Sequence, residues 1–404
     1  MKKKVLSLLL VAAMAVSMLV GCGEKEPDLV IWAPENQQEL LKEQEKQFKE
    51  ANPQYADMVF EYGIVGEDNA KTEVLKDVEA AADIYFFAND QLTELVNAGA
   101  IAKLGGTTAQ MVKDTMVESI VNTVSIDGEL YGIPFTHNTF FMYYDKTIFT
   151  EEEIKSLDTM LAKETAEGVY NFNFDAAGGW KLGAFFYGAG LTVFGEDGYD
   201  KAAGCNWNSA DGVAVVNYLI DMLKNPKVGN ALASDELAKE HKLGAWFDGA
   251  WAYNTNKEAL GDDLGIAVLP TYTINGTERQ LKAFYGTKAI GVNAKAKNME
   301  LAVLFATFLG TEEQQVARYN ASAQIPTNTK ASQIDAVKND IIAQVILKEV
   351  EMATVNQPTA ADFGAVYWNY AGAIPGDIVG DEPKLTKENA QEYLDKIVNA
   401  MTGK

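Results

Sequence analysis

Several aromatic residues of this chain stand beside polar side chains, at positions where strands end or loops begin. A flat ring next to hydrogen-bonding groups suits a sugar, which has apolar C–H faces and a rim of hydroxyl groups. Each aromatic contact of this kind contributes about 0.5–1.5 kcal/mol beyond simple burial. The aromatic candidates are Phe87, Trp180, Trp251, Phe363, Tyr367 and Trp368, and their polar neighbours include Asn36, Asp90 and Asn138.

The sequence lacks the motifs of metal-dependent, nucleophilic and nucleotide-dependent catalysis. Its two histidines are His137, in a predicted turn, and His241, and neither has a second ligand at metal-binding spacing. It contains no H-E-x-x-H, no G-x-S-x-G and no G-x-x-x-x-G-K-[ST]. A carboxylate pair of a glycoside hydrolase stays open, because any two of the 57 acidic residues could meet in space. We therefore predict a binding protein without metal or cofactor rather than an enzyme.

The first residues are typical of a secretory signal. Lys2, Lys3 and Lys4 precede an apolar or small run from 5 to 20, which is shorter than the about 20 residues of a membrane-spanning helix. Leu19-Val20-Gly21-Cys22 then resembles the bacterial lipobox, in which the cysteine is acylated and the chain is cut before it. We predict a signal peptide over 1–21, a lipid on Cys22 and a short tether over 22–28, which together place the protein on the outer face of the cytoplasmic membrane.

Composition limits the partners of the remaining chain. About 380 residues exceed the size at which one core stops growing, so two domains are expected. The full sequence has a net charge of −23, and the chain without its three leader lysines is more negative still. This charge repels nucleic acid and anionic lipid headgroups, which argues against both as ligands. If Cys22 carries a lipid, Cys205 has no partner, and disulfides do not stabilise this exported chain.

Strands and helices alternate along the body of the chain, which predicts doubly wound, mostly parallel sheets with flanking helices. The early part suggests strands over 29–32, 59–62 and 83–87, with helices over 38–50 and 71–81. Later, a helix over 211–224 is predicted. Gly310 closes another helix, and Thr311-Glu312-Glu313-Gln314 predicts a capping box that opens the next.

These segments, in this order, resemble the solute-binding proteins of carbohydrate ABC importers, and among them the maltose and maltodextrin-binding proteins most closely. The resemblance runs over nearly the whole chain after the leader. It is carried by the stretches Leu29-Val30-Ile31-Trp32, Ala82-Asp83-Ile84-Tyr85-Phe86-Phe87-Ala88-Asn89-Asp90, Asp127-Gly128-Glu129-Leu130-Tyr131-Gly132-Ile133-Pro134, Asp248-Gly249-Ala250-Trp251-Ala252 and Gly291-Val292-Asn293.

The resemblance assigns roles to individual residues. It implies aromatic platforms at Phe87, Trp180 and Trp251, and a hydroxyl-binding acid at Asp90. Asn36 and Asn138 stand where the family has carboxylates, and Gln37 where it has a lysine. Phe363 and Tyr367 align with a tryptophan and an arginine, and Trp368 is an adjacent platform candidate. These departures remove charge from the site and leave the identity of the sugar open.

The family's fold implies two α/β lobes of the type II periplasmic-binding-protein kind, with ligand between them. We expect an N-terminal lobe over 29–137 plus 287–326 and a C-terminal lobe over 138–286 plus 327–404. The chain would cross between them near 136–140, 283–288 and 325–328. The expected function is capture of maltodextrin-type oligosaccharides by a monomer and delivery to an ABC permease. A raffinose-type or β-linked sugar is the alternative, and a secreted glycoside hydrolase is a more distant one.

Overall fold

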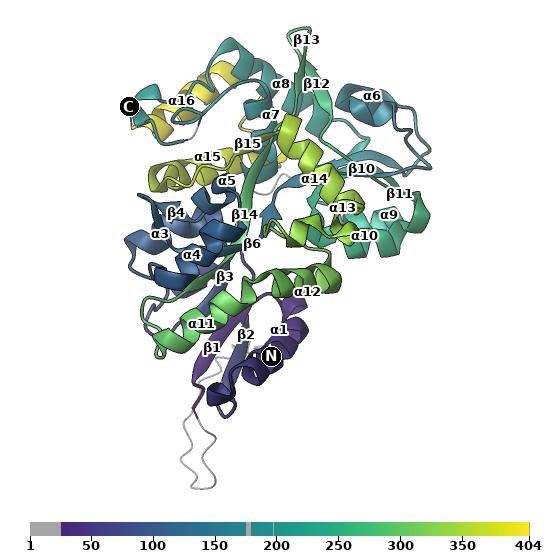
Figure 1. The fold of residues 1–404 in the computed structure, drawn as a ribbon. Coiled ribbons are helices and arrows are strands. Elements are labelled where there is room, and N and C mark those ends of the chain that lie inside the picture. Colours follow the sequence, from purple (N-terminus) through teal and green to yellow (C-terminus); the bar gives the residue numbers. More distant parts are fainter. Residues whose placement is uncertain (1–25, 175–178, 197, 404) are drawn as a thin grey trace, which may run out of the picture.

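The computed structural model describes residues 26–174, 179–196 and 198–403, and the predicted signal peptide and Cys22 lie outside this part. The protein has two lobes, each built from layers of helices and strands, and Figure 1 shows one lobe above the other. We call the lower one, with the first strand, the N-lobe, and the upper one, with the chain's C-terminus, the C-lobe. No helix in the described ranges has the length and apolar character needed to span a bilayer.

The N-lobe is built on a mixed sheet with the order β15-β14-β3-β1-β2, and β6 also pairs with β14. β1 is parallel to β2 and β3, whereas β14 is antiparallel to β3 and β6 and parallel to β15. The strands are β1 (Leu29–Ala33), β2 (Phe60–Ile64), β3 (Ile84–Ala88), β6 (Gly132–Asn138), β14 (Ala283–Val292) and β15 (Thr354–Asn356), and a small hairpin joins β4 (Ser125–Ile126) to β5 (Glu129–Leu130). All five residues of β3 are buried, as expected of a central strand covered on both faces.

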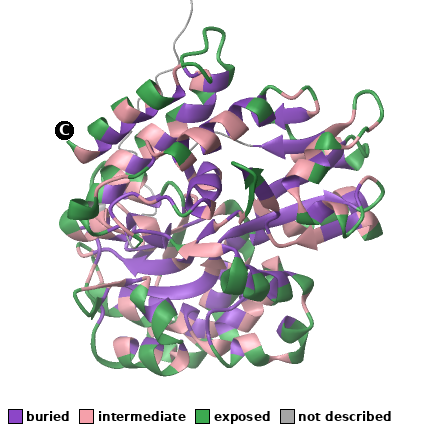
Figure 2. Ribbon diagram, turned by 90° about the horizontal axis from the view of Figure 1, so that it is seen from above, coloured by how far each residue is buried: buried purple, intermediate pink, exposed green. Residues whose placement is uncertain are grey.

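The N-lobe helices supply the covering layers, and their apolar residues join those of the strands in one core. The burial pattern in Figure 2 follows this plan, with purple strands inside and green helix faces outside. The helices are α1 (Gln38–Ala51), α2 (Ala70–Val74), α3 (Leu92–Asn97), α4 (Gly106–Thr115), α5 (Glu118–Asn122), α11 (Met299–Leu309) and α12 (Glu312–Ser322).

The C-lobe contains a second mixed sheet with the order β11-β7-β10-β8-β9. β10 is parallel to β8 and antiparallel to β7. The strands are β7 (Phe140–Asp145), β8 (Tyr170–Phe174), β9 (Val228–Asn230), β10 (Leu243–Gly249) and β11 (Leu264–Ala267), with a hairpin of β12 (Thr271–Ile274) and β13 (Thr277–Gln280). The helices are α6 (Leu157–Ala162), α7 (Gly179–Gly188), α8 (Ala210–Leu223), α9 (Ser234–Lys239), α10 (Tyr253–Leu260), α13 (Asp335–Lys338), α14 (Ile341–Met352), α15 (Ala361–Val379) and α16 (Ala390–Thr402).

Alternation along β7 divides the C-lobe interior into two cores. Phe140, Met142 and Tyr144 enter the larger core, whereas Phe141 and Tyr143 enter the smaller one on the other face of the sheet. Successive strand side chains point to opposite faces, so β7 is covered on both sides by apolar layers. Cys205 packs at the edge of the larger core, and burial raises the pKa of its thiol to about 11.

Three segments connect the lobes. Asn138 ends β6 and Phe140 begins β7, so the chain passes from one sheet to the other within about one residue. β14 contributes Phe284 to the larger C-lobe core and Ala289 and Ile290 to the N-lobe core. The third segment follows α12, where Ile325 already belongs to the smaller C-lobe core. Tyr285 and Ile325 each pack in the core of the lobe opposite to the predicted one, and the predicted lobe boundaries stay a prediction.

Two local predictions were wrong. The helix predicted over 71–81 ends at Val74, and the Asp77 carboxylate accepts hydrogen bonds from the Glu79 and Ala80 N–H groups in a turn that replaces it. The predicted capping box at Thr311 does not form, because the Thr311 hydroxyl donates to the Phe308 carbonyl of the preceding helix instead. In both cases a short polar side chain bonds to nearby backbone and so competes with the helical pattern.

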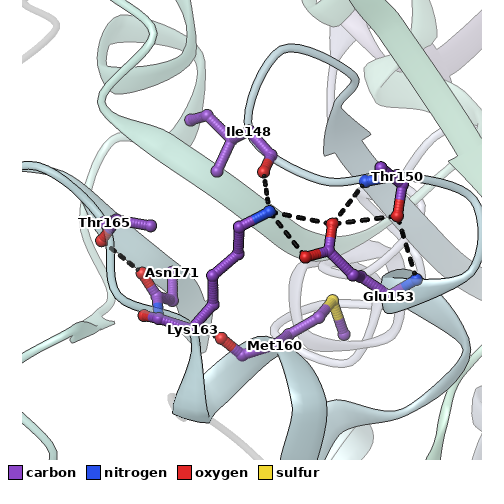
Figure 3. A network of polar contacts seen from close by, with 7 residues as sticks. All are labelled: Ile148, Thr150, Glu153, Met160, Lys163, Thr165 and Asn171. Atoms are coloured by element: carbon purple, nitrogen blue, oxygen red, sulfur yellow. Dashed lines mark hydrogen bonds and ion pairs between the residues drawn. The ribbon is translucent and has the colours of Figure 1, made fainter.

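A polar network far from the interlobe region fixes the start of β8 (Figure 3). The Asn171 amide donates to the Met160 and Lys163 carbonyls and accepts from the Thr165 hydroxyl. The Lys163 ammonium in turn binds Glu153, at 2.7 Å, and holds the pKa of that carboxyl near 2. Asn171 is fully buried, so this network fixes the first residues of β8.

Gln315 holds the third connection against the N-lobe, and its replacement tests this role. Its Oε1 accepts from the Thr327 and Asn328 N–H groups, both at 3.0 Å, while its Nε2 donates to the Pro134 carbonyl. In Gln315→Leu these buried groups lose their partner, so urea denaturation should show a loss of about 3 kcal/mol in the free energy of unfolding. Asn320→Ala, at an exposed position of the same helix, should change it by less than about 0.5 kcal/mol. Equal stability of the two variants would contradict the role of Gln315.

Candidate functional site

Trp251 is the most exposed aromatic residue among the predicted platforms. It lies on a 3-10 turn (Ala250–Ala252) directly after β10, and 37% of its surface is accessible. Its six-membered ring covers Gly249, where an added Cβ would lie 2.1 Å from two ring atoms. Only a glycine at 249 therefore allows this ring position, and the turn holds the indole at the edge of the C-lobe that faces the N-lobe.

Trp180, near the start of α7, lies beside Trp251. The ring centroids are 5.8 Å apart with an angle of 35° between the planes. Phe140 supports Trp180 edge-on at 4.8 Å, and the indole N–H donates to Gln357 Oε1 at 3.3 Å. The backbone N–H of Gln357 donates in turn to the Tyr285 carbonyl of β14. The two tryptophans thus form an aromatic surface that is anchored to the strand shared by both lobes.

A charged pair from the N-lobe meets this surface. The Lys288 ammonium, on β14, lies 4.9 Å from the centre of the Trp251 ring and 3.5 Å from Glu67 Oε2. Both side chains are nearly buried, with exposed fractions of 13% and 9%. Glu67 Oε1 accepts no hydrogen bond from any described residue. A buried carboxylate oxygen without a donor is costly, so Glu67 is suited to accept a hydrogen bond from a bound hydroxyl group.

The polar residues predicted for the site differ in their surroundings. Asn138 is almost buried at the end of β6, beside the connection to the C-lobe. Asn36 is exposed on the turn after β1. Gln37 is fully buried, where its Nε2 donates to Gln324 Oε1 at 3.2 Å and its Oε1 accepts from Arg318 Nε. Its amide is thus already engaged with the N-lobe.

Three of the predicted platforms lie inside cores instead of at the surface. Phe87 is fully buried in the N-lobe core, edge-on to Tyr85. Phe363 and Tyr367 are fully buried in the larger C-lobe core, stacked at 4.7 Å, and the Tyr367 hydroxyl donates to the Gly179 carbonyl. In this conformation none of the three rings has a free face for a ligand, because apolar neighbours cover both sides. Trp368, half-buried and edge-on to Tyr367, is more accessible than Phe363 and Tyr367 on the same helix.

Asp90 lies on a 3-10 turn (Asn89–Gln91) directly after β3. Burial raises the pKa of its carboxyl from 3.8 to about 7, and the nearby Glu94 and Asp68 carboxylates act in the same direction against Lys71. A carboxyl with this pKa exists in both forms near neutral pH, so it can donate or accept a hydrogen bond.

Sequence reasoning missed Lys288, Glu67 and Gln357. Lys288 carries a detectable signal, since it is the one charged residue in the otherwise uncharged stretch Ala283-Phe284-Tyr285-Gly286-Thr287-Lys288-Ala289-Ile290-Gly291-Val292. Glu67 lies in a polar turn whose sequence carries no sign of a binding site, and only the fold brings it next to Lys288. Gln357 is distant from both tryptophans in the sequence and reaches them because β15 pairs with β14.

This geometry is accompanied by clear similarity to known proteins. The model of the bacterial extracellular solute-binding protein family matches residues 44–345, and the chain belongs to that family. A solved structure with acarbose is 38% identical, with a TM-score of 0.87 over 93% of this chain and 98% of that one. The predicted two-lobed, type II α/β fold is thereby confirmed.

Two curated relatives match over most of their length. The maltooligosaccharide ABC transporter solute-binding lipoprotein of Streptococcus pneumoniae serotype 4 is 26% identical over 92% of this chain and 91% of its own. The galactooligosaccharide-binding protein of Bacillus subtilis is 25% identical over 89% of this chain and 88% of its own. Both relatives are binding proteins rather than enzymes.

The pKa of Asp90 predicts a pH dependence of stability. A carboxyl whose pKa is raised on folding stabilises the folded state below its unfolded pKa, and this contribution is lost as the pH rises to about 7. Asp90→Asn mimics the protonated form, so it should match wild type near pH 4 and exceed its stability above pH 7, by about 4 kcal/mol at most. Urea denaturation from pH 4 to 8 measures the difference. A constant offset for Asp90→Asn over this pH range would refute the raised pKa.

Proposed function

We propose that this protein captures a maltodextrin-type oligosaccharide between its lobes and delivers it to an ABC permease. The observation that carries the proposal is the pair Trp180 and Trp251 at the edge of the C-lobe, where the Trp251 ring faces Lys288 of β14. Sugar rings bind to exposed indoles through their apolar faces, and the neighbouring charged groups can accept and donate hydrogen bonds at the hydroxyl rim.

Contacts from both lobes explain how binding would be coupled to a change of shape. Trp251 belongs to the C-lobe, whereas Lys288 and Glu67 belong to the N-lobe. A ligand that touches all three favours the closed arrangement over any open one, because only the closed arrangement offers every contact. The permease would then recognise the closed form. No bond is made or broken in this process, so the role needs no catalytic residue.

The choice of maltodextrin rests on similarity as well as geometry. The 38% identical structure contains acarbose, and the pneumococcal relative is named for maltooligosaccharides. Galactooligosaccharides are the second candidate, because the Bacillus subtilis relative is named for them. The amides at Asn36 and Asn138, in place of the family's charged groups, also fit a sugar other than maltodextrin. A thermal-shift panel with maltodextrins, galactooligosaccharides, raffinose and acarbose would separate the candidates.

The predicted anchor completes the mechanism. A lipid on Cys22 and the tether over 22–28 would keep the binding cleft close to the permease at the outer face of the cytoplasmic membrane. Tethering is useful where no outer membrane retains a free receptor, so we propose a Gram-positive host and a protein that works as a monomer. The pneumococcal relative, which is named a lipoprotein, supports this proposal.

Replacement of Trp251 tests the proposed ligand and its platform. Calorimetry with maltotriose and longer maltodextrins should show micromolar binding to the wild type. Trp251→Ala should abolish it, since the loss of a stacking ring and its burial lowers affinity by at least about tenfold. Trp251→Phe retains a ring and should bind at an intermediate level. Wild-type protein that binds none of the maltodextrins would refute the substrate, and full binding by Trp251→Ala would refute the platform.

Replacement of Cys22 tests the anchor. Cys22→Ala removes the acylated thiol, so the expressed protein should move from the membrane fraction of a Gram-positive host to the medium. Cys205→Ala is the matched control and should remain with the membrane. Retention of Cys22→Ala on washed membranes would refute lipid attachment at this residue.

A further inference from the structure

The three connections between the lobes lie side by side at the end of β6. On one side β6 pairs with β14, where Thr287 lies opposite His137 (Figure 1). On its other side Thr136 forms an antiparallel bridge to Pro326 of the third connection, and the Thr136 hydroxyl donates to the Ile325 carbonyl at 2.9 Å. The last residues of β6 therefore join all three connections through paired backbone.

His137, predicted in a turn, lies on this part of β6 and extends the contact to side chains. Its Nδ1 lies 2.8 Å from the Tyr285 hydroxyl of β14, and the backbone of Pro326 also acts on the ring. Because proline has no N–H, that backbone group is the carbonyl, which only accepts. A neutral imidazole has one donating and one accepting nitrogen, so His137 can donate to Pro326 and accept from Tyr285. One ring thus links all three connections.

Both partners of the bond between His137 and Tyr285 hold the protonation states that it needs. Burial lowers the pKa of the His137 imidazole to about 4, although the Pro326 carbonyl acts in the opposite direction. Near neutral pH the ring therefore keeps one accepting nitrogen. Tyr285 packs in the N-lobe core, and burial raises the pKa of its hydroxyl. That hydroxyl stays protonated and can donate.

This link reaches the aromatic platform through β14. The Tyr285 carbonyl accepts from the backbone N–H of Gln357 at 2.8 Å, and Gln357 Oε1 accepts from the Trp180 indole at 3.3 Å. The pairing of β6 with β14 also shifts register directly after Lys288, and bulges of this kind bend a strand. His137 therefore lies where the connections can bend, and a path of hydrogen bonds along β14 joins it to Trp180.

We propose that His137 is a positioning residue that ties the three connections into one unit and thereby favours the lobe arrangement in which Lys288 meets Trp251. The hydrogen bond of the ring to Tyr285 is made together with this contact between the lobes, so an arrangement that separates the connections loses both. The inference rests on the proposed function and adds a residue that controls binding without touching the sugar. Because the link sets only the population of the competent arrangement, its loss weakens binding of every sugar by the same factor.

Removal of the Tyr285 hydroxyl tests the inference in full-length mature protein. Tyr285→Phe keeps the ring and breaks the bond to His137. Tyr85→Phe is the matched control, because its buried hydroxyl donates to the Ala100 carbonyl inside the N-lobe. Small-angle X-ray scattering without sugar should give a larger radius of gyration for Tyr285→Phe than for the wild type and the control. Calorimetry should show an equal loss of affinity for maltotriose and maltohexaose, about threefold to tenfold.

The other partner of the bond completes the test. If the two side chains act through one link, the double variant His137→Phe/Tyr285→Phe should lose no more affinity than His137→Phe alone. A Tyr285→Phe variant that matches Tyr85→Phe in both radius of gyration and affinity would overturn the inference and leave the proposed function standing. If the wild type binds neither sugar, maltodextrin capture is refuted. The scattering then decides the inference by itself, and a radius of gyration equal to that of the control overturns it.

Discussion

The arrangement of this protein depends on β14, a ten-residue strand that belongs to both lobes. Its first residues pair with β15 and enter the larger C-lobe core, and its later residues pair with β3 and β6 and enter the N-lobe core. A single strand can do this because successive stretches of it enter different cores, while strand partners along its length satisfy its backbone hydrogen bonds. The candidate site follows from this constraint. Lys288 lies on β14 where the strand leaves the C-lobe, and Gln357 reaches Trp180 through the strand that β14 pairs with.

The candidate site combines an aromatic surface with a few charged groups that are largely shielded from water. The Lys288 ammonium faces both an aromatic ring and a carboxylate, so its charge is compensated from two sides. Cation–π contacts of this kind are worth about 0.5–2 kcal/mol, the upper part of that range applying when the cation is desolvated. A sugar that enters between Lys288 and Trp251 would exchange this contact for ring stacking and hydroxyl hydrogen bonds, so a ligand must offer both to bind well.

The fold was predictable from the sequence because central strands such as β3 and β7 are buried on both faces and the strands therefore read as apolar runs. Leu29-Val30-Ile31-Trp32 and the stretch around Phe86 are examples, and the resemblance to a known family then fixed their order. The platforms were predictable only in part. Trp251, predicted at the end of a strand, is exposed, whereas Phe363 looked equivalent in sequence and lies in the core. Whether an aromatic residue is covered depends on distant segments, such as Phe284 against Phe363, and local sequence does not contain that information. Glu67 was missed for the same reason.

The state of Cys205 bears on how lobe movement can be measured. Its thiol is packed against a core and has a raised pKa, so it forms little of the thiolate that reacts with maleimides and disulfides. In a chain that begins after Cys22 it is the only native cysteine. Cysteines introduced on the outer helices of each lobe would therefore be labelled selectively with spectroscopic probes, while Cys205 remains silent. The distance between such probes would report the closing of the lobes in otherwise native protein, without first removing a residue from its core.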